Sequence, residues 1–149
     1  MNDPFSRALF LGHIASTLFM IGVIWFVQVV HYPLLGRVAP HDIPRYEQAH
    51  TRLATLVVGP PMLAELASGV ILLWVRPAAV SSLQAWTGIA LLAVTCCSTQ
   101  FVQVPCHARL SQAFDPAVYR RLVRTNWVRT VAWSLRGLLV LWMLWKVLM

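Results

Sequence analysis

The sequence has very little charge. Asp, Glu, Lys and Arg make up 11% of its 149 residues, whereas a soluble globular domain carries about 25%. Acidic residues are the scarcest, with five against twelve basic ones. This composition argues against a soluble protein. It also argues against nucleic-acid binding, because no soluble face is left on which a nucleic acid could lie.

Cysteine is scarce as well, and its placement excludes a disulfide framework. Cys96 and Cys97 are neighbours within one apolar stretch, and Cys106 lies just beyond it. Neighbouring side chains on a helix point about 100° apart, so these three residues are expected to be packing thiols.

What the sequence has instead is long hydrophobic runs. Hydrophobic residues make up 58% of the chain. Glu65 alone interrupts the second run, and Arg129, Arg136 and Lys146 interrupt the fourth. The runs are residues 8–32, 53–75, 86–104 and 128–149. About 20 residues of helix cross a bilayer core, and backbone groups in lipid must be satisfied within the segment. The sequence therefore predicts four transmembrane helices.

These helices form a single all-α domain over residues 1–149, an up-down bundle of two tandem helical hairpins. Pro60 and Pro61 each remove a backbone donor and are expected to kink the second helix. Asp115 and Pro116 are expected to start a short interfacial helix at about 116–124. The first run is too long for the apolar part of a signal peptide, so it is expected to remain in the mature protein. The predicted membrane helices are residues 8–32, 43–75, 86–104 and 126–149.

Arginine is concentrated in two of the three connections. The first and third connections carry seven arginines, against three basic residues toward the other side, Arg7, Arg76 and Lys146, with Arg129 and Arg136 set aside as part of the fourth helix. The seven are Arg37, Arg45, Arg52, Arg109, Arg120, Arg121 and Arg124. The positive-inside rule then places both connections in the cytoplasm and both termini outside. The expected location is the bacterial inner membrane, with anionic lipid head groups or an acidic ligand as the partner of this charge.

A weak internal repeat supports the two hairpins. The tetrapeptide Phe-Val-Gln-Val closes the first apolar run at 26–29 and the third at 101–104, and His31 and His107 follow. A tandem duplication about an axis along the membrane normal would produce this order.

Polar side chains interrupt the helices and predict a polar pocket toward one membrane face. The expected lining residues are Gln28, Tyr46, Arg52, Glu65, Gln103, Asn126, Arg129 and Arg136. Arginines in a dry pocket can clamp a carboxylate or phosphate. His50 or Glu47 could then move a proton. A lipid-soluble molecule such as a quinone, a porphyrin or an acyl chain could enter from the membrane.

Two of these residues lie deep in their helices. Glu65 and Arg136 fall near the middle of the bilayer core, where a lone charge costs at least about 2.5 kcal/mol. The simplest solutions are that they face each other as a structural ion pair, or that both line a wet cavity.

Metal-ligand residue types also gather at one end. Glu47 and His50 have the spacing with which two side chains of one helix grip one metal. The second repeat has Arg120 and Val123 at the corresponding positions, which speaks against a symmetric di-iron site. A single zinc, copper or iron ion or a bis-histidine haem on His31 and His107 remains open, as does a plain hydrogen-bonding role. The candidate ligands are His31, Glu47, His50 and His107.

Three stretches carry a resemblance that spans nearly the whole chain. They are residues 25–34 (WFVQVVHYPL), 59–66 (GPPMLAEL) and 125–130 (TNWVRT). They resemble stretches of small four-helix bacterial integral membrane proteins. The resemblance implies the fold and the membrane location but no activity. Size and helix count are also similar to those of small haem-binding membrane protoporphyrinogen oxidases, although no motif of that family is present.

These observations leave two functional hypotheses. The first is a membrane-embedded binding or redox module that holds a metal, a haem or an amphipathic anionic ligand. The second is a non-catalytic accessory subunit or a small transporter protomer, in which Glu65 and Arg136 are structural or line a pathway completed by a second copy in a homo-oligomer. The sequence does not distinguish an enzyme from a binding protein.

Overall fold

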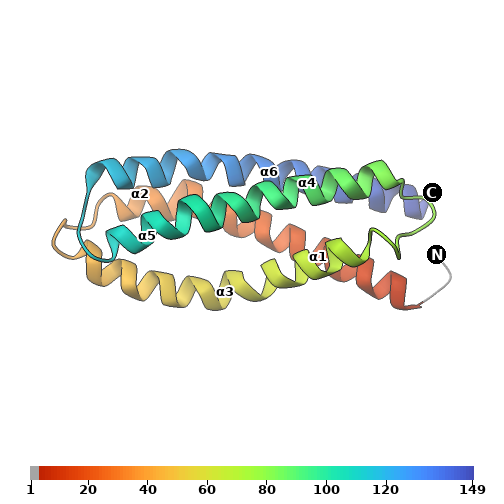
Figure 1. Cartoon of the computed structure of the whole chain (residues 1–149), viewed down its shortest axis with the longest axis horizontal. Coiled ribbons are helices and arrows are strands. Elements are labelled where there is room, and N and C mark those ends of the chain that lie inside the picture. The colour runs from red at the N-terminus through yellow and green to blue at the C-terminus, as the bar shows by residue number, and fades with distance from the viewer. Residues whose placement is uncertain (1–3) are drawn as a thin grey trace.

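The computed structural model describes residues 4–149, and all regular secondary structure in this range is helical (Figure 1). Two π-helical turns, η1 and η2, interrupt the first and third long helices without ending them. The elements are α1 (Pro4–Phe26), η1 (Val27–His31), α2 (Tyr32–Leu35), α3 (Ile43–Ile71), α4 (Ser82–Ser98), η2 (Thr99–Gln103), α5 (Val104–Leu110) and α6 (Pro116–Leu148).

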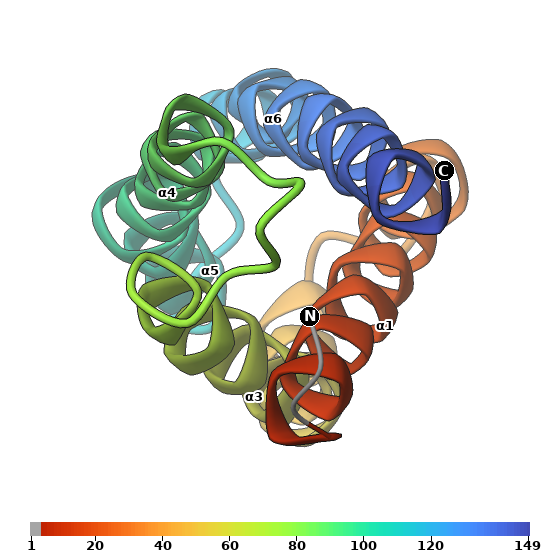
Figure 2. The same cartoon turned by 90° about the vertical axis from the view of Figure 1, so that its right-hand side faces the viewer.

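The elements form four long antiparallel spans packed as one bundle. Seen from its end, the bundle is a ring in which α1 lies beside α3 and α6, and α4 lies between α3 and α6 (Figure 2). The start of α1, the end of α6 and the connection 72–81 lie at one end. Connections 36–42 and 111–115 lie at the other, called here the arginine-rich end. Each span is long and apolar enough to cross a membrane. The predicted all-α four-helix bundle is thereby confirmed.

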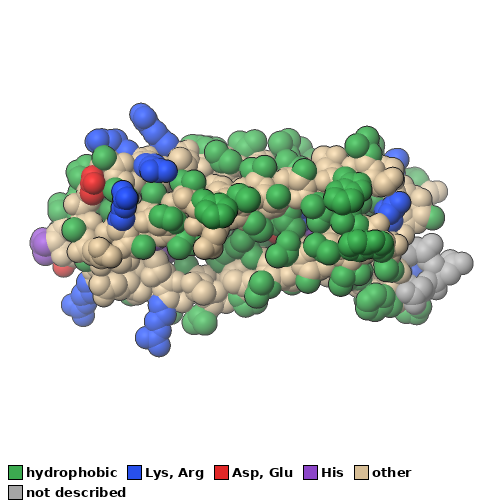
Figure 3. Space-filling model, in the orientation of Figure 1, with side chains coloured by type: hydrophobic (Ala, Val, Ile, Leu, Met, Phe, Trp, Pro, Cys, Tyr) green, Lys and Arg blue, Asp and Glu red, His purple; other side chains and the backbone are tan. Residues whose placement is uncertain are grey.

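The exposed surface of the spans is largely apolar (Figure 3). The interior is partly polar. Leu56, Leu63 and Leu138 are each more than 60% exposed, whereas Glu47, Glu65 and Asn126 are fully buried. This arrangement fits a lipid environment, because hydrocarbon solvates leucine and does not solvate a carboxylate.

The helix boundaries differ from the expected ones at the arginine-rich end. Residues 116–124, expected as a separate interfacial helix, continue into α6 without a break. Asp115 caps this helix, since its Oδ1 accepts from the backbone N–H of Ala117 at 2.7 Å. The first turns do not lie flat because Val118 and Leu122 are buried in an apolar core cluster at this end. Helix α3 runs through Pro60 and Pro61 as one helix.

Two prolines explain the π-helical turns. Each turn ends two residues before a proline, η1 before Pro33 and η2 before Pro105. A proline has no N–H and its ring clashes with the carbonyl four residues earlier. One extra residue in the turn relieves this clash, and the N–H groups of Tyr32 and Val104 bond five residues back, to Val27 and Thr99.

The paired π turns correspond to the repeat seen in the sequence. Each contains the glutamine of one Phe-Val-Gln-Val copy, Gln28 in η1 and Gln103 in η2, and both glutamines are buried. The two hairpins therefore share a local distortion as well as a sequence pattern, and this distortion turns one amide from each hairpin into the bundle.

Candidate functional site

A buried ion pair joins α3 to α6. Arg136 Nε lies 2.7 Å from Glu65 Oε1, and neither side chain is more than 1% exposed. Thr17 donates to the same oxygen at 2.8 Å, and Trp133 Nε1 donates to Oε2 at 3.0 Å. The predicted pairing of Glu65 with Arg136 is confirmed.

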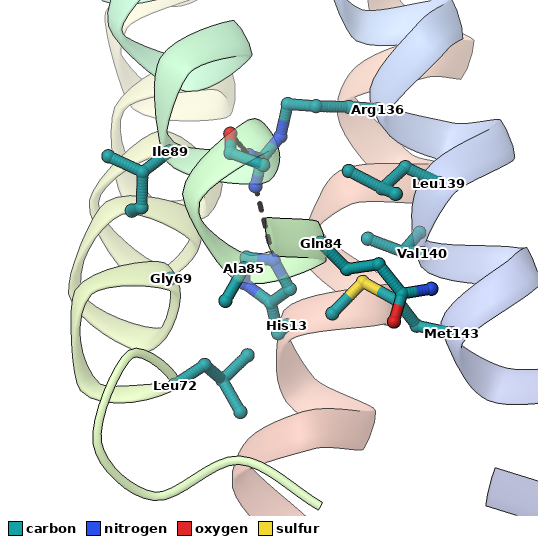
Figure 4. Close-up of a pocket in the computed structure, with 11 residues that line it drawn as sticks. His13, Gly69, Leu72, Gln84, Ala85, Ile89, Arg136, Leu139, Val140 and Met143 are labelled. Carbon is teal, nitrogen blue, oxygen red and sulfur yellow. Dashed lines mark hydrogen bonds between the residues drawn. The ribbon is translucent and has the colours of Figure 1, made fainter. Parts of the chain in front are cut away.

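A histidine of α1 completes this network. Arg136 Nη2 lies 3.1 Å from His13 Nε2 (Figure 4). Arginine can only donate, so His13 Nε2 accepts, and its Nδ1–H donates to Ser68 Oγ at 2.7 Å. Ser68 Oγ in turn donates to the carbonyl of Ala64 at 2.5 Å. Arg136 Nη1 donates to the carbonyl of Gly88 on α4.

This network ties all four spans together and leaves no room for a ligand. The cavity beside His13, Gly69 and Arg136 measures about 20 Å³, which is space for about one water molecule. Every oxygen of the Glu65 carboxylate has a donor. The geometry therefore fits a structural lock.

A second polar network lies nearer the arginine-rich end and uses both π turns. Asn126 Nδ2 donates to Gln28 Oε1 at 2.8 Å, and Asn126 Oδ1 accepts from Arg129 Nε at 2.9 Å. Gln103 Nε2 donates to Thr125 Oγ1 at 2.8 Å. The two repeat glutamines thus bond to adjacent residues of α6, Gln28 to Asn126 and Gln103 to Thr125.

Arg129 is the charged centre of that network, and it has only neutral partners. It is 8% exposed. Its Nη1 donates to Thr99 Oγ1 at 3.2 Å, and its Nη2 donates to Asn126 Oδ1 at 2.5 Å and Gln103 Oε1 at 3.3 Å. Within residues 4–149, no carboxylate forms an ion pair with this guanidinium. Arg136 differs from it in this respect.

Four aromatic rings stack at the arginine-rich end. The rings of His31 and His50 lie 4.1 Å apart at 16°, and Tyr46 stacks with both at about 6 Å. His107 tilts against His50 at 5.4 Å. Three histidines predicted to converge are therefore in contact.

Glu47, a fully buried carboxylate, lies beside His107. His107 Nδ1 is 2.7 Å from Glu47 Oε2. Glu47 Oε1 and His31 Nε2 are both buried without a hydrogen-bond partner. Buried polar atoms without a partner are uncommon, and a bound water, a bound ion or a catalytic role are among their explanations.

The proposed metal ligands gather without forming a recognisable metal site. Within residues 4–149, no three His, Cys, Asp or Glu side chains are arranged to hold a metal ion. The ring of His50 packs against both His31 and His107, the two histidines considered for a haem. The metal and haem hypotheses stay predictions.

A cavity of about 570 Å³ connects two of the histidines, His50 and His107, to Arg129. It lies among α1, α3, α6 and the span from α4 to α5, and most of its lining is apolar. Its charged or ring-bearing polar side chains are His50, His107, Arg129 and Trp133, and its other polar side chains are Gln100, Gln103, Thr51, Thr55, Thr99 and Ser111. Arg129 and His107 therefore face one space.

The expected pocket residues separate into groups. Glu65 and Arg136 form the lock, Gln28, Gln103, Asn126 and Arg129 form the central network, and Tyr46 stacks on the histidines. Arg52 is exposed on α3, because two residues of helix rotate it about 200° from His50.

Sequence reasoning missed His13 and Tyr32 as members of these networks. Tyr32 is fully buried, and its hydroxyl donates to Gln103 Oε1 at 3.1 Å. His13 precedes Thr17 by four residues, so the two polar side chains share one face of the first helix, and this spacing was a usable signal.

In comparisons with known proteins, no family model, no curated protein and no solved structure matches the chain. Fold and site together define a four-helix bundle of candidate membrane spans with a buried His, Glu and Arg network.

Proposed function

We propose that this protein is a membrane-embedded binding protein for an amphipathic anion, with Arg129 as the anchor for the acidic group. The observation that carries the proposal is the placement of Arg129, a buried guanidinium with neutral partners that lines the 570 Å³ cavity.

Arg129 and Arg136, both in α6, differ in whether a carboxylate neutralises their charge. Burying a charge costs roughly several kcal/mol in lost hydration, and a counterion or hydrogen bonds must offset this cost. Arg136 has Glu65 as its counterion, whereas Arg129 has an open cavity beside it. A ligand carboxylate or phosphate there would make charge-assisted hydrogen bonds with the guanidinium.

The rest of the cavity suits an apolar chain. Met20, Ile24, Val58 and Met62 line it from α1 and α3. Its volume lies within the roughly 300–1,000 Å³ of small-molecule pockets. Some lining residues are themselves exposed, among them Thr55 on α3 and Val104 on α5. Lateral entry between α3 and α5, from the lipid, follows from this lining.

His107 and His50 add a proton-transfer capacity to the same space. Both line the cavity, and His107 is hydrogen-bonded to Glu47. An imidazole held by a carboxylate can take a proton from a ligand's head group or return one to it. Binding is the primary function proposed here, and proton exchange with the ligand would be its chemistry.

The experiment uses two probes of equal chain length. Delipidated protein in a neutral detergent is titrated with hexadecanoic acid and, separately, with hexadecan-1-ol, and native mass spectrometry counts bound molecules. A charge-assisted hydrogen bond contributes about 1.5–3 kcal/mol, so Arg129→Gln should weaken binding of the acid about tenfold to a hundredfold. Arg124→Gln, an exposed change in the same helix, serves as the control. Equal binding of acid and alcohol, or equal loss in both variants, would contradict the proposal.

A metal or haem in the histidine cluster is the second candidate. The unpartnered Glu47 Oε1 and His31 Nε2 are the observations that favour it, since both are atoms that coordinate metals. Visible absorption and elemental analysis of the purified protein test it. A Soret band or stoichiometric metal that is lost in His50→Ala and His107→Ala supports this candidate. Colourless protein that stays metal-free after a rebinding step counts against it.

An accessory or transporter role is the remaining hypothesis. Under this hypothesis Glu65 and Arg136 are either structural or line a pathway. The hydrogen bonds around Glu65 favour the structural role, because both carboxylate oxygens already have donors and do not need an ion as a partner.

A further inference from the structure

A second recess lies on the outside of the bundle, between α5 and α6. It measures about 220 Å³ and is separate from the cavity around Arg129, with which it shares no lining residue. Arg109 and Arg121 flank it, and Phe101, Val102 and Pro105 form its apolar part.

The recess changes from charged to apolar along the membrane normal. Arg109 is one residue from the end of α5, and Arg121 lies about 7 Å into α6 at 1.5 Å per residue. Phe101 lies about 12 Å deeper along the helix than Arg109 and is 72% exposed. The head-group layer of a bilayer is about 5–7 Å thick on each side. The arginines therefore lie near head-group depth, and the apolar part lies at the depth of the acyl chains.

The two guanidiniums have no acidic partner within residues 4–149. Asp42 and Asp115 are the only described carboxylates outside the buried interior, and Asp115 is engaged as the cap of α6. Two arginines that line one recess together with an apolar surface match a phosphate ester attached to acyl chains.

We propose that this recess binds one anionic phospholipid, with its phosphate between Arg109 and Arg121 and its acyl chains along Phe101 and Val102. The site would hold the arginine-rich end at the head-group layer. It does not depend on the ligand proposed for the inner cavity.

The test compares two lipids that differ in head-group charge. Delipidated protein in neutral detergent is titrated with dioleoylphosphatidylglycerol or dioleoylphosphatidylcholine, and native mass spectrometry gives the affinity for the first bound lipid. The unaltered protein should prefer phosphatidylglycerol by about tenfold. The double variant Arg109→Gln/Arg121→Gln should bind both lipids equally.

The matched control is Arg120→Gln/Arg124→Gln, which removes the same charge from the same end but not from the recess. It should keep the preference. Equal loss in both double variants would show diffuse attraction to the whole end and overturn the proposal. Displacement of the lipid by millimolar inorganic phosphate would overturn it too, because the site would then select a free anion.

Discussion

Trp133 Nε1 donates to Glu65 Oε2 at 3.0 Å, and the same side chain lines the 570 Å³ cavity. One fully buried residue thus contacts both the structural ion pair and the proposed binding space. An occupant of the cavity would touch a side chain that orients the Glu65 carboxylate, so ligand binding and the stability of the lock should be linked.

The first prediction concerns the ion pair itself. Glu65→Gln and Arg136→Gln should each destabilise the protein by about 3–5 kcal/mol, because each leaves a buried charge without its partner. The double variant should recover part of the combined loss. Reversible unfolding in detergent, followed by circular dichroism, measures the four free energies of the cycle. The exposed change Arg37→Gln should have little effect. Strictly additive losses would show that the two side chains do not interact.

The second prediction compares the two buried carboxylates. Glu65 receives three hydrogen-bond donors, whereas Glu47 has one oxygen without a partner. Glu47→Gln should therefore cost less stability than Glu65→Gln, about 1–2 kcal/mol. The same unfolding measurement checks this. An equal or larger loss for Glu47→Gln would mean that Glu47 holds the fold together as strongly as the lock does.

The third prediction concerns two glycines in the membrane spans. A Cβ on Gly69 would lie 3.2 Å from His13 Cε1 and 3.4 Å from Ile89 Cδ1, whereas nothing lies within 4 Å of one on Gly22. Gly69→Ala should cost about 1–3 kcal/mol through crowding of His13. Gly22→Ala should be neutral or stabilising by about 0.5–1 kcal/mol, as expected for alanine within a helix. Melting temperatures of the two variants test the contrast, and a stabilised Gly69→Ala would contradict the packing described.

The fourth prediction links the π turns to binding. Pro105→Ala restores an N–H and removes the ring, so η2 should relax toward a regular helix and rotate Gln103 away from Arg129. Binding of hexadecanoic acid should weaken while the protein stays folded. Pro44→Ala, at the first turn of α3 where proline disturbs no hydrogen bond, should leave binding unchanged. Unaltered affinity in Pro105→Ala would separate the π turn from the proposed site.

The four-helix bundle could be predicted from the sequence because each span is marked by about 20 mostly apolar residues, so one exceptional residue does not hide the pattern. The Glu65–Arg136 pair could also be predicted, because two isolated charges at similar depth in hydrocarbon have few other partners. The repeat of Phe-Val-Gln-Val in the sequence also indicated two hairpins.

What sequence could not supply is the rotation of side chains about their helices. Each π turn adds one residue and so rotates the side chains that follow it about the helix axis. A regular period of 3.6 residues per turn therefore predicts the wrong direction for side chains beyond Gln28 and Gln103. Arg52 is a different case, because α3 contains no π turn and its regular helical period already turns Arg52 about 200° away from His50. The continuity of α6 through residues 116–124 depended on burial of Val118 and Leu122, a tertiary effect that composition does not reveal.

The lock between α3 and α6 also has a consequence for biogenesis. The chain is made from its N-terminus, so Glu65 enters the membrane before Arg136 has been synthesised. Until then, α3 carries a carboxylate that costs about 2.5–3.5 kcal/mol at the centre of a helix. Arrival of α6 supplies both Arg136 and Trp133 to that carboxylate. Helix α6 is therefore the one that commits the three helices before it to the bundle, and a chain truncated before residue 136 should be left with a helix poorly anchored in the bilayer.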